Sequence, residues 1–163
     1  MINLKRSLFL LPVIFISVAV NAQIKFGLDA PEISLPSVNG DTLHLSSLKG
    51  KVVLLDFWAS WCGPCRATNK KLVKLYPKFK DKGFEIFGVS FDEHSQNWKK
   101  AVQKDKITWL QVHDGGGWDA PTAISWQVEV IPTSYLINKE GKLIAMDLDP
   151  KDLEKVLKEI LGD

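Results

Sequence analysis

An apolar run that leads directly into a pair of cysteines is the feature that most constrains this chain of 163 residues. Residues 52–57 are apolar except for Asp56, a pattern typical of a central strand that is covered on both faces. Cys62 and Cys65 come next, and apolar residues then recur at helical spacing as far as Phe79. We therefore expect a buried strand, a turn and a helix that begins at the cysteines.

The remaining patterns predict one α/β domain with a central mixed β-sheet flanked by helices. An N-terminal hairpin with Asn39-Gly40 as its turn is expected before the first strand. Further strands are expected at 84–91, 109–112, 134–137 and 143–146, and further helices at 96–104, 121–126 and from Pro150 to about Leu161, the last with Asp149 as its N-cap. The strand-helix-strand order at the cysteines predicts a parallel, right-handed crossover. The first helix is expected to end near Lys82-Gly83 with a glycine stop, and Pro77 predicts a kink in it or an early end near Tyr76.

The first 22 residues differ from the rest and have the order of a secretory signal peptide. Lys5 and Arg6 precede an uncharged apolar block at 8–20, and small residues close it at Ala22. We predict cleavage after Ala22, which divides the chain into a signal peptide at 1–22 and a domain at 23–163. An uncleaved membrane anchor is the alternative, but the apolar block is short for a span, which needs about 20 apolar residues.

The charge balance argues against nucleic acid as a partner. Loss of residues 1–22 would remove two of the 21 basic residues and no acid, which leaves 19 of each sign. Proteins that bind polyanions carry a basic excess gathered on one face, and the sequence shows neither an excess nor an obvious cluster.

The spacing of the two cysteines predicts reactivity. Export would place the chain where disulfides form, but a bridge between Cys62 and Cys65 closes a very short loop and stabilises the fold little. Zinc would need further ligands, and His44, His94 and His113 are scattered singly. We expect no metal and no cofactor.

A Cys-Gly-Pro-Cys run at the start of a helix suits thiol-disulfide exchange. Such chemistry needs one accessible thiolate that attacks a disulfide and a second thiol that resolves the mixed disulfide. The positive end of the helix would stabilise the thiolate of Cys62 and lower its pKa, while Cys65 would be shielded one turn further in. Gly63 and Pro64 fit the first turn of a helix.

Residues 56–65, Asp-Phe-Trp-Ala-Ser-Trp-Cys-Gly-Pro-Cys, resemble the active-site segment of thioredoxin. Together with Ala30-Pro31 and the run 48–51, they resemble the exported TlpA/ResA-like branch of the AhpC/TSA group. Residues 131–137 resemble the proline loop and hairpin of that family. The resemblance covers about residues 27–161 and implies a thioredoxin-like fold with an N-terminal hairpin extension.

The resemblance also implies roles for individual residues. Ile131-Pro132 would form a cis peptide bond that faces the cysteines, and Trp61, Ile131 and Pro132 would bind substrate. Asp56 matches the buried acid of the family and would have a raised pKa and exchange a proton with Cys65.

The chain also departs from the branch. Relatives often carry a glutamate where this chain has Thr68 and a proline where it has Lys70. Any tuning by that glutamate is lost here, which leaves Asp56 as the main candidate acid.

The expected function is a thiol-disulfide oxidoreductase that reduces disulfides in exported, periplasmic client proteins such as apocytochromes. A membrane electron donor would then re-reduce Cys62 and Cys65. Two alternatives stay open: a thiol peroxidase, although Ala59 stands where peroxidases have threonine, and a metal-binding thiol carrier. Oligomeric state, client and direction of electron flow are left open.

Overall fold

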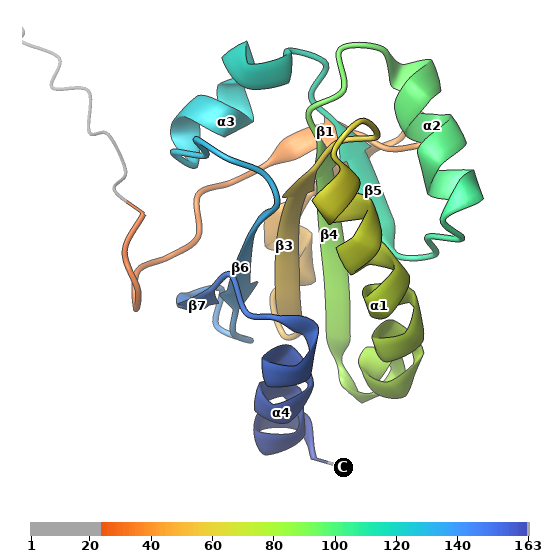
Figure 1. Ribbon diagram of the computed structural model, residues 1–163. Helices are drawn as coiled ribbons and strands as arrows, with labels where there is room; N and C mark the ends of the chain where they lie inside the picture. The colour runs from red at the N-terminus through yellow and green to blue at the C-terminus, as the bar shows by residue number, and fades with distance from the viewer. Residues whose placement is uncertain (1–23, 163) are drawn as a thin grey trace, which may run out of the picture.

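A five-stranded mixed sheet forms the centre of the computed structural model, which describes residues 24–162 (Figure 1). The sheet has the order β5-β4-β3-β6-β7 and consists of β3 (Val52–Trp58), β4 (Phe84–Ser90), β5 (Leu110–His113), β6 (Thr133–Ile137) and β7 (Leu143–Met146). β3 pairs with β4 in parallel and with β6 antiparallel, so the sheet is mixed as predicted. The predicted signal peptide at 1–22 lies outside the described residues.

Helices cover one face of the sheet. They are α1 (Gly63–Phe79), α2 (Ser95–Lys104) and α4 (Pro150–Leu161), which share a buried cluster with Leu54 and Trp58 of β3. Asp149 caps α4, since its side chain accepts the backbone N–H groups of residues 151 and 152, and Pro150 takes the first helical position. The predicted cap of the terminal helix is therefore confirmed.

The opposite face is covered by shorter elements. These are the hairpin of β1 (Ser34–Pro36) and β2 (Thr42–His44), the 3-10 turns η1 (Leu45–Leu48) and η3 (Gly117–Asp119), and α3 (Pro121–Ser125). Leu45 and Leu48 of η1 and Ala123 of α3 belong to the cluster on this face. The hairpin turn includes Asn39 and Gly40, as predicted, and Gly40 has a φ of +95°. It is longer than the two residues expected, because the N–H of Ser37 donates to the carbonyl of Asp41 and residues 38–40 lie between them.

Of the two effects predicted for Pro77, an early end near Tyr76 is wrong, because α1 continues through Pro77 to Phe79. Pro77 removes only one helical N–H, two residues before the end of the helix, and the buried side chains of Tyr76 and Phe79 hold the last turn against the core. A short 3-10 turn, η2 (Lys80–Lys82), follows, and Gly83 ends it in the left-handed conformation. The predicted glycine stop is therefore correct.

We predict that Leu153→Ala lowers the free energy of unfolding by about 2–5 kcal/mol, because it opens a cavity between α4 and the sheet. Leu153 is buried in the helix-covered cluster. Ile160→Ala on the same helix is the control, since Ile160 is 40% exposed and should lose much less. Urea unfolding of both variants checks the prediction, and equal losses would contradict this packing of α4.

Candidate functional site

The two cysteines lie at the junction between β3 and α1. β3 ends at Trp58, a short turn follows, and α1 begins at Gly63 with Cys62 as its N-cap residue. Cys62 and Cys65 form a disulfide with a Cα–Cα distance of 5.3 Å. The prediction that the helix begins at the cysteines is confirmed.

The start of α1 favours negative charge on the sulfur of Cys62. The Sγ atom of Cys62 accepts the backbone N–H of Cys65 at 3.1 Å. The first turn contains Pro64 and no acidic residue. In the reduced protein this N–H and the positive end of the helix would stabilise a thiolate on Cys62.

The site is less open than the sequence suggests. We expected an accessible Cys62 and a shielded Cys65, but Cys62 is only 5% exposed in the disulfide, and Cys65 is fully buried. The cause is that both belong to the helix-side cluster, against which Ile131 also packs. The ranking of the two sulfurs is as predicted, with the first cysteine the more accessible.

Asp56 lies in the middle of β3 and is 3% exposed. Because burial disfavours the charged form, and because the charge of Asp147 acts in the same direction, the pKa of Asp56 is raised to about 7. The raised pKa is as predicted. The contribution of Asp147 was not foreseen, since it follows β7 and is brought close only by the pairing of β3 with β6 and of β6 with β7. The carboxyl can therefore take and return protons near neutral pH.

A buried polar network that the sequence did not reveal holds the turn before Cys62. The carboxylate of Asp92 accepts the backbone N–H of Ser60 at 2.8 Å and also binds the hydroxyl groups of Ser60 and Ser90. Arg66 donates to the carbonyl of Ser60 at 3.0 Å and pairs with Asp105. Asp92, which follows β4, and Arg66 of α1 thus both hold Ser60, and these contacts fix the turn that precedes Cys62.

The loop before β6 faces the same cluster. The Ile131-Pro132 bond is cis, as predicted, and Ile131 packs against the cluster that contains both cysteines. Thr133 fixes the loop by donating its hydroxyl hydrogen to the carbonyl of Val130 at 2.7 Å. The backbone N–H and C=O of Ile131 make no hydrogen bond within residues 24–162, so both are free for a bound chain.

Two tryptophans form an exposed apolar patch near the disulfide. Trp61 is 59% exposed and Trp118 is 47% exposed, and their ring centroids lie 6.3 Å apart. Trp118 also contacts Phe91 edge-on, with centroids 5.8 Å apart. Trp58, in contrast, is fully buried. The position of Trp118 was left open by the sequence, because its loop follows three glycines and has no periodic pattern.

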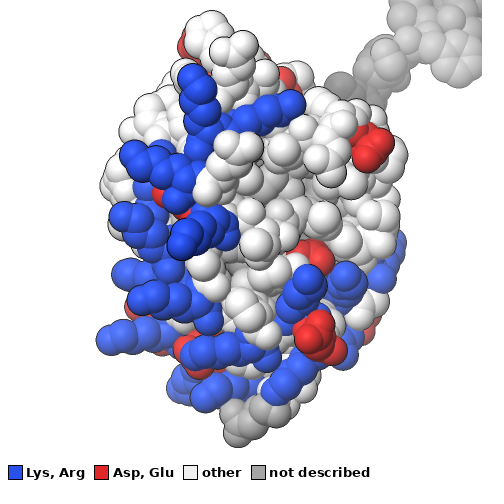
Figure 2. Space-filling model, turned by 90° about the vertical axis from the view of Figure 1, so that its right-hand side faces the viewer, with Lys and Arg blue, Asp and Glu red and all other residues white. Residues whose placement is uncertain are grey.

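The expectation that the chain has no basic cluster is wrong (Figure 2). Neither α1 nor α2 contains an acidic residue, and their basic residues are Arg66, Lys70, Lys71, Lys74, Lys78, Lys99, Lys100 and Lys104. Arg66, Lys100 and Lys104 line one groove together with Ser60, so the two helices share this basic face. The sequence hid the cluster because the acids that balance the net charge lie in other elements.

Because Thr68 stands where relatives often carry a glutamate, α1 contains no acidic residue. Thr68 is half-buried and Lys70 is exposed, and the buried residue between them is Asn69. Neither the nitrogen nor the oxygen of the Asn69 amide has a hydrogen-bond partner within residues 24–162. On α1 no side chain can therefore replace Asp56 as the proton acceptor.

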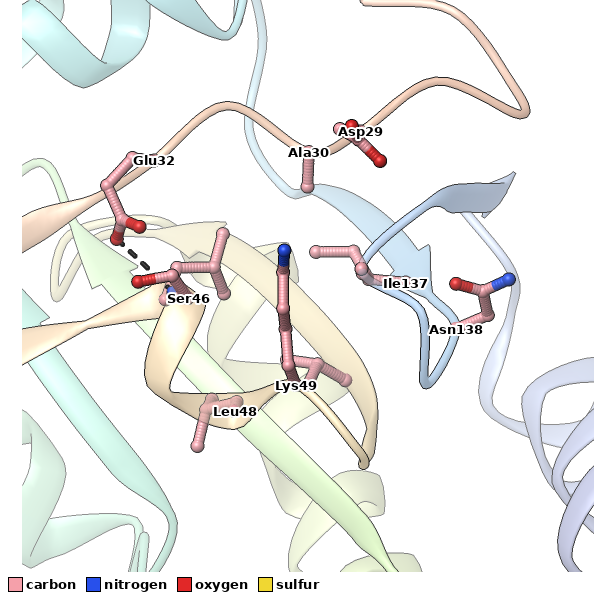
Figure 3. A pocket seen from close by; sticks show the side chains of 11 residues that line it. Asp29, Ala30, Glu32, Ser46, Leu48, Lys49, Ile137 and Asn138 are labelled. Atoms are coloured by element: carbon pink, nitrogen blue, oxygen red, sulfur yellow. Dashed lines mark hydrogen bonds between the residues drawn. The ribbon is translucent and has the colours of Figure 1, made fainter.

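A separate cavity of about 150 Å³ lies at the other end of the sheet (Figure 3). Its lining includes Val53 at the start of β3 and Ile137 at the end of β6, whereas the cysteines follow the far end of β3. The pKa of Glu32, which lines this cavity, lies below its usual value. Burial alone would raise this pKa, but the hydrogen bonds that the carboxylate accepts from Ser46 and Ile33 outweigh the effect of burial. The cavity does not touch the disulfide.

No group of three or more potential metal ligands occurs among residues 24–162. His113 contacts a backbone carbonyl through its Nε2 atom and stacks on Trp98.

The chain is similar to known thiol-disulfide oxidoreductases. The AhpC/TSA family model matches residues 26–146. The thiol-disulfide oxidoreductase ResA of Bacillus thuringiensis subsp. konkukian is 34% identical over 141 residues, which are 85% of this chain and 80% of that protein. ResA of Geobacillus kaustophilus is 30% identical over 84% of this chain and 79% of that protein.

The chain is also similar in structure to solved thiol-disulfide oxidoreductases. The thioredoxin domain of a thiol-disulfide oxidoreductase from Bacteroides vulgatus superposes with a TM-score of 0.79 at 36% identity, covering 85% of this chain and 99% of that one. A thiol:disulfide interchange protein from Bacteroides sp. superposes with a TM-score of 0.77, also at 36% identity, covering 86% of this chain and 92% of that one. The predicted thioredoxin-like fold is confirmed.

We predict that Asp56→Asn stabilises the oxidised protein increasingly as pH rises from 4 to 7. A carboxyl with a pKa of about 7 when folded and 3.8 as its usual value binds more protons when folded, so its contribution to stability is complete below pH 4 and is lost through pH 7. The gain over the wild type should reach roughly 2–4 kcal/mol above pH 7.

Urea unfolding at pH 4, 6 and 8 measures this gain. Asp41→Asn serves as the control, because Asp41 is exposed in the hairpin. A gain that is the same at all three pH values would show that Asp56 does not titrate in this range.

Proposed function

Because the chain belongs to the AhpC/TSA family, we propose that it is a thiol-disulfide oxidoreductase that reduces disulfides in exported proteins through Cys62 and Cys65. The observation that carries the proposal is a disulfide at the N-terminus of α1, on the sheet face that also carries Asp56, a buried acid with a pKa raised to about 7. This arrangement supplies a stabilised thiolate, a resolving thiol and a proton acceptor.

The first step is attack by the thiolate of Cys62 on a disulfide of the client. One client sulfur forms a mixed disulfide with Cys62, and the other leaves as a thiolate. The backbone N–H of Cys65 and the start of α1 stabilise the attacking sulfur.

The second step is attack by Cys65 on the mixed disulfide. Asp56 takes the proton of Cys65, whose sulfur then displaces the second client thiolate from Cys62. The client gains two electrons, and its two thiolates take up one proton returned by Asp56 and one from solvent, which received the proton of Cys62 when its thiolate formed. The enzyme ends as the Cys62–Cys65 disulfide.

Trp61, Ile131 and Pro132 are proposed to bind the client chain. The free backbone N–H and C=O of Ile131 can pair with an extended segment, and Trp61 offers exposed apolar surface beside Cys62. Disulfide-containing proteins are the class of substrate that fits such a site.

Export and the electron source form a finer part of the proposal. The charge and hydropathy of residues 1–22 support a signal peptide cleaved after Ala22 and a periplasmic location. Among the residues that the structure describes, no helix is long and apolar enough to cross a membrane. An exported reductase cannot draw on cytosolic reductants directly, so a membrane electron donor is proposed to re-reduce the disulfide.

We predict that the protein from Gln23 onward catalyses reduction of insulin disulfides by dithiothreitol. Cys62→Ser should abolish turnover because it removes the nucleophile. Cys65→Ser should also stop turnover but should accumulate a mixed disulfide with insulin, because the resolving thiol is absent. Turbidity of the released insulin chains and mass spectrometry of the trapped complex measure these outcomes.

The same preparations separate the alternatives. Consumption of hydrogen peroxide without insulin reduction would favour a thiol peroxidase, and tight copper binding without either activity would favour a metal-binding carrier. Either result would overturn the proposed reduction.

A further inference from the structure

Three residues stand side by side in adjacent strands beneath the disulfide. Asp56 of β3 is in register with Gly88 of β4, and Gly88 is in register with Gln111 of β5. Side chains in register on neighbouring strands point to the same face of a sheet. Trp58 lies two residues after Asp56 in β3, and Trp109 lies two residues before Gln111, directly before β5; both belong to the cluster that contains Cys65. Asp56 and Gln111 therefore face the same layer as the cysteines.

The missing side chain of Gly88 makes room for the amide of Gln111. A Cβ atom on Gly88 would lie 2.1 Å from Nε2 of Gln111 and 2.8 Å from its Cδ, so the amide lies directly over β4. Adjacent strands are about 4.8 Å apart, which places the Cβ position of Gly88 one strand spacing from Asp56. The Nε2 group thus extends from β5 toward the buried carboxyl of β3.

Two tryptophans fix the orientation of this amide. The Oε1 atom of Gln111 accepts the indole N–H of Trp58 at 2.9 Å and that of Trp98 at 3.4 Å. An indole nitrogen can only donate, so exchange of the amide oxygen and nitrogen would set donors against donors.

Among the described residues, neither the Nε2 group of Gln111 nor the carboxyl group of Asp56 has a hydrogen-bond partner. The Nε2 atom of Gln111 is buried and has no hydrogen-bond partner within residues 24–162. The carboxyl of Asp56 makes no hydrogen bond with the described residues either. A buried donor without a partner is costly and calls for a functional explanation.

We propose that Gln111 is a positioning residue for proton transfer at Cys65, and that its Nε2–H group holds the ionised carboxylate of Asp56 directly or through one water molecule. This inference rests on the proposed function, since it assigns Gln111 to the step in which Asp56 takes the proton of Cys65. The hydrogen bond forms with the ionised carboxylate, aligns it for that step and weakens when Asp56 is protonated.

Few titratable side chains among the described residues lie near the row formed by Asp56, Gly88 and Gln111. Cys65 lies above it on α1, and Asp147 follows β7 and acts on Asp56 through its charge. His113 is at the end of β5, but its Nε2 contacts the backbone carbonyl of Asp92 at 2.6 Å and its ring stacks on Trp98. β4 contributes Gly88 to the row, so no charged side chain stands between Asp56 and Gln111.

The experiment follows the side-chain ¹⁵N–¹H resonances of Gln111 in the oxidised protein from pH 5 to 9. We expect them to shift with an inflection near pH 7, together with the ¹³C resonance of the Asp56 carboxyl, and to lose this inflection in Asp56→Asn. Gln111→Met keeps the volume and removes the donor, and it should raise the titration midpoint of Asp56 by about one unit. The pH profile of insulin reduction should move in the same direction.

Gln103→Met is the matched control, because Gln103 is exposed on α2 and should leave both midpoints unchanged. Resonances of Gln111 without an inflection, or with one that persists in Asp56→Asn, would overturn the inference even if Gln111→Met failed to fold. An unchanged pH profile in a folded Gln111→Met would overturn it while leaving the proposed function intact. Absence of insulin reduction in the wild type would instead refute the proposed function.

Discussion

The site depends on the way a fully buried strand passes into the first turn of a helix. β3 is buried along its whole length, so its direction is fixed by contacts on both faces. The start of the helix that follows is therefore fixed as well. Cys62 is its N-cap residue, and the sulfur of Cys62 accepts the backbone N–H of Cys65, which has no partner within the helix. The contacts of Asp92 and Arg66 with Ser60 keep the intervening turn from shifting this position.

The same buried strand carries a group that works against stability. A carboxyl in the centre of a sheet loses its hydration, and its charged form is disfavoured. An apolar residue at this position would avoid that cost. The proposed proton transfer with Cys65 explains why an acid stands there instead, on the sheet face that carries the cysteines. Gly88 is a second such compromise, since a glycine inside a strand weakens it and here makes room for Gln111.

The sequence predicted those parts of the fold and site that follow from local patterns. The strand-turn-helix unit, the hairpin turn and the cap of α4 each have the residue types that their backbone geometry requires. Asp56 was recognisable because it interrupts an apolar run. Gln111 and Asp147 were not, because only the order of the strands in the sheet brings β5 and the end of β7 near β3. The basic face of α1 and α2 was missed for a similar reason, since net charge says nothing about its distribution.

The environments of the two sulfurs determine which one reacts first. Cys62 lies at the positive end of α1 and retains some contact with solvent, and both conditions favour its thiolate. Cys65 is fully buried on the sheet face that carries Asp56, so a second negative charge there would be disfavoured by burial and by repulsion from an ionised carboxylate. In the proposed mechanism Cys65 therefore keeps its proton while Cys62 attacks. Transfer of that proton to Asp56 would make Cys65 the second nucleophile, so the proposed resolving step depends on the protonation state of that acid.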